Sequence, residues 1–136
     1  LTMTASVTFY NGTAYRRILL PITIFVRTDA GSSFETAKSI TVGQYRGHVI
    51  TYYDEEDFYS VFFEANQTVN VKVTGLPYLQ VSIYDPDRNL IANSVDTESE
   101  LTFKTRMSGQ FFILLRHPES SSYGDYILDV SFFILN

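Results

Sequence analysis

Apolar and polar residues alternate along many short segments of this chain, and this pattern limits the fold more than any other feature. Val69, Val71 and Val73 are each followed by a polar residue, and positions 79–84 repeat the pattern with Leu, Val and Ile. Successive side chains of a β-strand point to opposite faces, so a period of two residues predicts half-buried strands. Further strands are predicted at 58–64, 90–92, 100–104, 110–116 and 126–134.

These predicted strands follow one another closely, with turn residues such as Asp85-Pro86-Asp87 between them and no helix-length period. Such spacing is typical of antiparallel sandwiches and jelly rolls. We therefore predict an all-β fold, an antiparallel β-sandwich of jelly-roll-like form. Residues 111–115 are apolar at every position, which indicates a strand in the centre of a sheet. One short helical turn is predicted over 34–40, with Ser33 as its N-cap.

The chain is large enough for one domain with its own core. It has 136 residues, of which 45% are hydrophobic, and this excludes a disordered tail. Its net charge of −5 argues against a nucleic-acid partner, because phosphate binding needs a basic face. There is no Cys, so disulfides and Cys-based zinc sites are excluded. The longest apolar run near the start, 18–26, contains Pro21 and Thr23 and is too short to span a membrane.

The charge changes sign near residue 29. Residues 1–28 contain three Arg and no acid, a net charge of +3, whereas residues 29–136 contain seven basic and fifteen acidic residues, a net charge of −8. We interpret 29–136 as a separate domain. Residues 1–28 are predicted to form a β-hairpin around the Asn11-Gly12 turn, with Pro21 at an edge or a bulge. A lone hairpin is marginal in water, so we expect the end of a preceding domain or an added edge of the sandwich.

The sequence contains no signature of a catalytic centre. It has two His residues, no Gly-x-Ser-x-Gly segment and no His-Glu-x-x-His segment. We therefore predict that this chain is not itself an enzyme. Because it starts without Met and without a signal peptide, we interpret it as part of a longer protein.

An ordered set of short motifs connects the chain to a known family. The motifs are Phe34-Glu35-Thr36-Ala37, Asp57-Phe58-Tyr59-Ser60 and the segments 81–86, 108–113 and 123–128. In this order they resemble the bacterial pre-peptidase C-terminal domain family over about residues 29–136. The resemblance implies a β-sandwich accessory domain, placed C-terminal to the catalytic domain of a secreted protease such as a subtilisin-like enzyme. The catalytic domain of that protease is then the expected partner.

Four consecutive acids, residues 54–57, precede one of the predicted strands. Adjacent carboxylates repel one another, so such a run either stays in solvent or gathers around a cation such as calcium. Collagen-binding modules similar to the family bind calcium between an N-terminal linker and a D-x-x-D loop. The resemblance therefore implies a calcium site formed by Asp54 and Asp57 of the loop with Asp29 and Glu35 of the linker, and the alternative is a solvated acidic loop.

The sequence thus predicts a non-catalytic accessory domain that acts outside the cell or at its surface and stabilises a parent protease, with calcium as its expected ion. Two alternatives remain open at this point. In the first, the domain is a module that binds a substrate or a matrix component, either protein or polysaccharide. In the second, it is a structural domain of a cell-surface protein.

Overall fold

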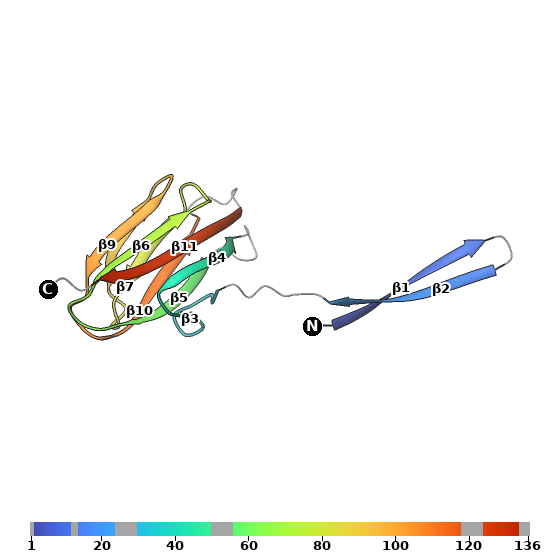
Figure 1. Ribbon diagram of the computed structural model, residues 1–136, viewed down its shortest axis with the longest axis horizontal. Helices are drawn as coiled ribbons and strands as arrows, with labels where there is room; N and C mark the ends of the chain where they lie inside the picture. Colours follow the sequence, from blue (N-terminus) through green and yellow to red (C-terminus); the bar gives the residue numbers. More distant parts are fainter. Residues whose placement is uncertain (1, 12–13, 24–29, 50–55, 118–123, 134–136) are drawn as a thin grey trace.

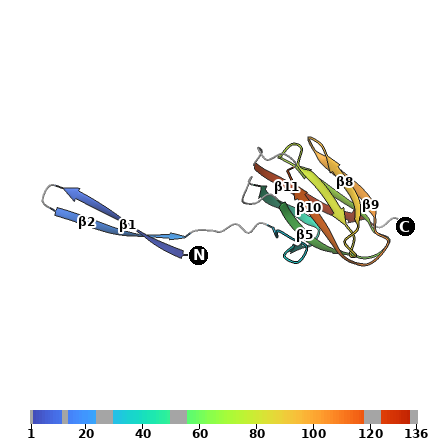
Figure 2. The ribbon, with the colours of Figure 1, turned by 180° about the vertical axis from the view of Figure 1, so that it is seen from behind.

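A computed structural model describes residues 2–11, 14–23, 30–49, 56–117 and 124–133 of the chain. From residue 30 onward the described strands form two sheets that pack face to face as two layers of a β-sandwich (Figure 1, Figure 2). This confirms the predicted all-β sandwich. Within these ranges there is no helix of the length and apolarity that crossing a membrane requires.

One layer is a five-stranded sheet. Its spatial order is β3 (Lys38–Ile40), β5 (Glu56–Phe63), β10 (Gly109–Arg116), β7 (Gln80–Tyr84) and β8 (Leu90–Val95). The short edge strand β3 runs parallel to β5, and the other neighbours are antiparallel. β10 lies in the middle of this sheet, as its uninterrupted apolar segment predicted.

The second layer is a four-stranded antiparallel sheet. Its order is β4 (Gly43–Val49), β11 (Gly124–Phe133), β6 (Thr68–Thr74) and β9 (Ser99–Lys104). β8 and β9 follow each other in the chain but belong to different sheets, so their connection closes one side of the sandwich. The chain crosses between the layers repeatedly, as jelly-roll-like folds do.

Alternate residues of both sheets build the core between the layers. Val69, Val71 and Val73 of β6 are buried and the residues between them are half-buried, which is the alternation that the sequence predicted. Tyr59 and Tyr126 are the largest fully buried side chains. The core therefore contains two phenols among aliphatic and Phe side chains, and their hydroxyl groups need partners inside it.

Residues near the N-terminus form a separate two-stranded sheet of β1 (Thr2–Asn11) and β2 (Ala14–Thr23). Asn11 pairs with Ala14, so the connection lies one residue later than the predicted Asn-Gly turn. Pro21 lies opposite Thr4, in a sheet where both strands are edges, which agrees with its predicted position. The predicted continuation of the second strand to residue 26 lies outside the described residues.

The predicted helical turn is shorter than expected. Ser33 does cap a single turn, because its Oγ accepts a hydrogen bond from the Thr36 amide at 3.2 Å and Thr36 Oγ1 accepts one from the Ser33 amide at 3.0 Å. The predicted helical segment ends there, because Lys38–Ile40 leave the turn and pair with β5 as strand β3. The backbone hydrogen bonds offered by the edge of β5 prevail over the weak helical tendency of so short a segment.

Candidate functional site

Asp57 lies inside the sandwich, at the beginning of β5. Its exposed fraction is 0%, and it occupies the same face of the strand as the core residues Tyr59 and Val61. A carboxylate without water is stable only when hydrogen-bond donors or a cation replace that water. The surroundings of Asp57 are therefore a candidate functional site.

A tyrosine from the opposite sheet supplies such a donor. The hydroxyl of Tyr126, on β11, donates to Oδ2 of Asp57 at 2.5 Å, and Tyr59 Oη lies 2.6 Å from Tyr126 Oη. Since Tyr126 has only one proton to donate, Tyr59 donates the second hydrogen bond to the Tyr126 oxygen. Asp57, Tyr126 and Tyr59 thus form a buried polar network that joins the two sheets.

The network holds the Tyr126 phenol in its neutral form. Burial raises the pKa of Tyr126 far above its ordinary value of 10.0, and the negative charge of Asp57 and the neighbouring Tyr59 raise it further. A phenol with so high a pKa remains a hydrogen-bond donor at every physiological pH. It does not act as a proton-transfer group there, because its pKa lies too far from neutrality.

Gly47 of β4 makes room for the Tyr126 ring. The two residues are directly opposite in the β4–β11 ladder. A Cβ atom at position 47 would lie 2.1 Å from both Cζ and Oη of Tyr126, far inside contact distance. The ring lies over the glycine in the manner known for aromatic residues paired with strand glycines, and this position directs its hydroxyl to Asp57.

The segment that enters the sandwich attaches to β5 directly beside Asp57. The Gly31 amide donates to the Phe58 carbonyl at 3.1 Å, and the Phe58 amide donates to the Gly31 carbonyl at 2.8 Å. A Cβ atom at Gly31 would lie 2.0 Å from the Thr36 carbonyl oxygen, so the backbone is tightly enclosed here. The entering chain is therefore fixed to the sheet edge by backbone contacts on both sides.

Phe34 fixes the same segment to the outer face of the five-stranded sheet. Its ring meets Phe58, Tyr84 and Phe112 edge to face, with centroid distances of 5.2, 5.1 and 5.1 Å. The Arg88 guanidinium lies 4.9 Å above the Phe34 ring and forms an ion pair of 2.7 Å with Glu35. This linker dock, residues 30–36 with Phe58, Tyr84, Arg88 and Phe112, explains why Phe58 is buried although it points away from the core.

The four predicted calcium ligands have different positions. Asp57 is buried and bonded to Tyr126. Glu35 is exposed and paired with Arg88, which lowers the pKa of Glu35, chiefly through that hydrogen bond. Asp29 and Asp54 lie outside the described residues. Among the residues that are described, no three His, Asp or Glu side chains gather as a metal-binding group. The calcium site stays a prediction.

Sequence reasoning overlooked the residues that make this region distinctive. Tyr126, Tyr59 and Gly47 are not recognisable as a group, because they lie on three strands of two sheets. One signal was nevertheless available. Asp57 is in phase with the buried face of its strand, and an acid at such a position predicts a buried carboxylate with a donor nearby.

The fold and the dock together define a β-sandwich domain with a docked entry segment, and solved structures of this fold are known. The periplasmic inhibitor of g-type lysozyme PliG from Aeromonas hydrophila matches with a TM-score of 0.56 and 22% identity, over 71% of this chain and 98% of that one. The pre-peptidase C-terminal domain of a Bacillus anthracis collagenase matches with a TM-score of 0.55 and 16% identity, over 69% and 93%. No protein-family model and no curated protein sequence matches the chain.

A third match, PliG from Salmonella Typhimurium, has a TM-score of 0.53 and 13% identity, over 72% of this chain and 100% of that one. At these identities the matches show a common fold. The collagenase domain supports the resemblance that the sequence motifs suggested. Two of these neighbours are inhibitors of g-type lysozyme and one is the pre-peptidase C-terminal domain of a collagenase.

Proposed function

We propose that residues 29–136 form a non-catalytic accessory domain of a secreted or cell-surface protease, which the domain stabilises. The linker dock is the observation that carries this proposal. Two backbone hydrogen bonds at Gly31 and three aromatic contacts at Phe34 hold the entry segment on the sandwich. A chain that precedes the domain is thereby attached to the sandwich at a defined place. A flexible linker would make no such fixed contacts.

Stabilisation of a parent domain follows from such an attachment. In this proposal the docked segment limits the orientations of the preceding domain, and any contact made only by the folded parent stabilises that folded state. The Asp57–Tyr126–Tyr59 network keeps the two layers of the accessory domain in register beneath the dock. The likeness to the collagenase domain supports a protease as the parent.

Heat inactivation of the parent protein tests the proposal. We expect the parent without residues 29–136 to lose activity faster than the full-length protein, and Phe34→Ala in the full-length protein to have an intermediate effect. Arg46→Gln, an exposed change on β4, serves as the control. Equal half-lives of the full-length and truncated proteins would refute the stabilising role.

We also propose calcium as the ion of the region around Asp57. Calcium needs six to eight oxygen ligands, and the described residues contribute the carboxylate of Asp57, one of whose oxygens accepts the Tyr126 hydrogen bond. Glu35 is already paired with Arg88. The proposal therefore depends on Asp29, Asp54 and main-chain carbonyls to complete the coordination. Calcium there would join the linker to the acidic loop and add to the stability of the domain.

A binding function is the second candidate, and the PliG likeness favours it. PliG proteins of this fold are inhibitors of g-type lysozyme, and this chain matches nearly their whole length. An assay of g-type lysozyme activity with and without the chain tests an inhibitory role directly. Pull-down on insoluble collagen, chitin and cell-wall material tests the matrix-binding alternative. A purely structural cell-surface domain would give no signal in either experiment.

A further inference from the structure

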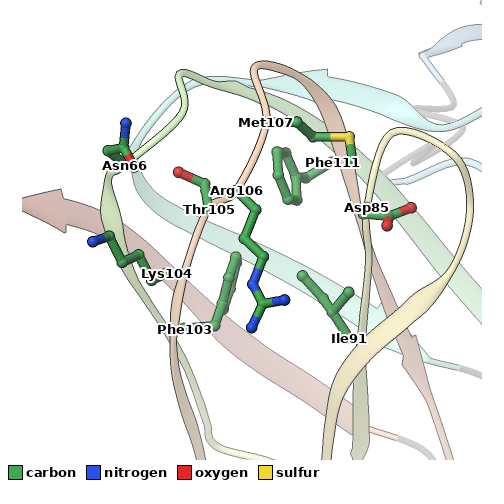
Figure 3. Close-up of a pocket in the computed structure, with 9 residues that line it drawn as sticks. All are labelled: Asn66, Asp85, Ile91, Phe103, Lys104, Thr105, Arg106, Met107 and Phe111. Atoms are coloured by element: carbon green, nitrogen blue, oxygen red, sulfur yellow. The ribbon is translucent and has the colours of Figure 1, made fainter.

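A pocket opens at the end of the sandwich that is remote from Asp57. The β5–β10 ladder gives the direction, because Gly109 pairs with Phe63 at the pocket end and Arg116 pairs with Glu56 at the Asp57 end. The pocket has a volume of about 720 Å³ and lies between the 105–107 segment, the end of β7 and the beginning of β8 (Figure 3). Volumes of roughly 300–1,000 Å³ are usual for ligand sites in proteins.

The wall of this pocket has an apolar part beside a polar part. Ile91, Phe103, Met107 and Phe111 line it, and Ile91 and Met107 are exposed by 42% and 37%. The rings of Phe103 and Phe111 lie 6.1 Å apart, and Phe63 supports Phe111 from the core at 5.6 Å. The apolar part of the wall is therefore continuous with the aromatic part of the core.

Arg106 places a positive charge within these walls. Figure 3 shows its side chain extending from the loop to a position between Phe103 and Ile91. Among the described residues no carboxylate forms an ion pair with Arg106. Asp85 also lines the pocket, but its carboxylate accepts the amides of Asp87 and Asn89 at 2.9 Å and is committed to its own turn. The cation is thus available to a ligand.

The backbone beside Arg106 is held firmly. Thr105 is 1% exposed, and its hydroxyl donates to the Glu64 carbonyl at 2.6 Å while accepting the Gln67 amide at 2.9 Å. The Asn66 amide donates to the Thr105 carbonyl at 2.9 Å. A ligand that binds Arg106 therefore pays little for ordering the loop, which favours affinity.

We propose that this pocket binds the carboxyl end of a peptide, with an apolar terminal side chain in the hollow and the terminal carboxylate on the Arg106 guanidinium. The local charge is complementary to a carboxylate, since Arg106 and Lys104 both line the pocket beside its apolar part. Asn66 also lines the hollow, and a carboxamide can both donate to and accept from a peptide group. A fatty acid would leave this amide unused, which is why a peptide is the favoured ligand.

Titration of the chain with N-acetyl-Leu-Phe as free acid and as amide tests the assignment, with backbone NMR shifts as the readout. We expect the acid to shift Phe103, Arg106 and Met107 and to bind about tenfold more tightly than the amide, because only the acid offers a charge-assisted pair to the guanidinium. Arg106→Gln should abolish this difference. Arg46→Gln, also an exposed cation but on β4, should preserve it.

Several results would overturn the proposal. Equal affinities for the acid and the amide would show that the carboxylate plays no part in binding. If Arg46→Gln and Arg106→Gln lowered the affinity for the acid equally, the preference for the acid would be a general electrostatic attraction and not a contact with Arg106. The absence of shifts at the pocket up to the solubility limit of the acid would refute the site. Decanoate that binds as tightly as the peptide acid would overturn the peptide assignment. None of these results depends on whether the domain stabilises a protease.

Discussion

The Tyr126 hydroxyl, on the four-stranded sheet, donates a 2.5 Å hydrogen bond to Asp57, on the five-stranded sheet. Sixty-nine residues separate the two partners in the chain, so this bond exists only when both layers have formed and packed. The acceptor is charged and buried, which makes the bond valuable, because hydrogen bonds to charged groups stabilise a fold more than neutral ones do. The pair therefore reports the integrity of the whole sandwich.

We predict that Tyr126→Phe destabilises the domain by about 2 kcal/mol. The substitution removes one oxygen, keeps the ring and takes one donor from buried Asp57, and a hydrogen bond to a charged group contributes about 1.5–3 kcal/mol. Urea unfolding followed by circular dichroism measures the change. Tyr78→Phe is the control, because Tyr78 is 56% exposed and should change stability by less than about 0.5 kcal/mol. Equal effects of the two substitutions would show that the bond contributes nothing.

A second prediction concerns alkaline pH. Because the pKa of Tyr126 is raised in the folded state, its contribution to stability is complete below the ordinary value of 10.0 and is lost as the pH rises above it. The urea midpoint of the wild type should fall between pH 9.5 and about 11 more steeply than that of Tyr126→Phe, which has no proton to lose at this position. Parallel pH profiles for the two proteins would contradict this interpretation.

Gly47→Ala should destabilise the domain by about 2 kcal/mol, although alanine suits a strand no worse than glycine. The added Cβ would collide with the Tyr126 ring, and overpacking of this kind typically costs about 1–3 kcal/mol. The double variant Gly47→Ala/Tyr126→Leu tests whether the collision with the ring is the cause, because the ring is then absent. We expect the two changes to be strongly non-additive, and additive free energies of unfolding would locate the effect elsewhere.

The sequence predicts strands best where its apolar pattern matches the burial of the two faces. β6 alternates because one face is in the core, and β10 is apolar at every position of 111–115 because it lies in the middle of its sheet. β4 was not predicted, because Gly43, Gln44, Arg46, Gly47 and His48 leave it with few apolar residues. Its place in the sheet comes from the ladder with β11 and from the ring over Gly47, which are contacts between distant parts of the chain.

The site was less accessible to sequence reasoning than the fold. The sequence contains the motif around Phe34, but it does not predict that Phe34 meets Phe58, Tyr84 and Phe112, since these lie on three different strands. Asp57 was singled out as a metal ligand, and its bond to Tyr126 was not foreseen. The chemistry of each residue can be read from the sequence. To predict which side chains pair across the two layers, the order of the strands in the sheets must also be known.

Phe34→Ala should loosen the linker dock without unfolding the sandwich. Complete burial of a Phe makes its truncation cost about 3–5 kcal/mol, and since Phe34 is half-buried we expect about 2 kcal/mol. Hydrogen exchange of the Phe58 amide, which donates to Gly31, should accelerate more than that of the Val71 amide in β6. Arg88→Gln, which removes only the exposed ion pair and the contact with the ring, should cost less than about 1 kcal/mol.

Calcium should raise the melting temperature of residues 29–136 if the proposed site forms. A hundredfold excess over the dissociation constant stabilises the folded state by about 2.7 kcal/mol, which corresponds to a rise of about 10 °C in a domain of this size. Calorimetric scans at pH 7.5 with calcium, with magnesium and with EDTA measure it. Asp54→Ala should abolish the calcium response, whereas Glu55→Ala, a neighbouring acid that we expect to face solvent, should preserve it. Identical scans with calcium and EDTA would exclude the ion, and a full response in Asp54→Ala would exclude this ligand set.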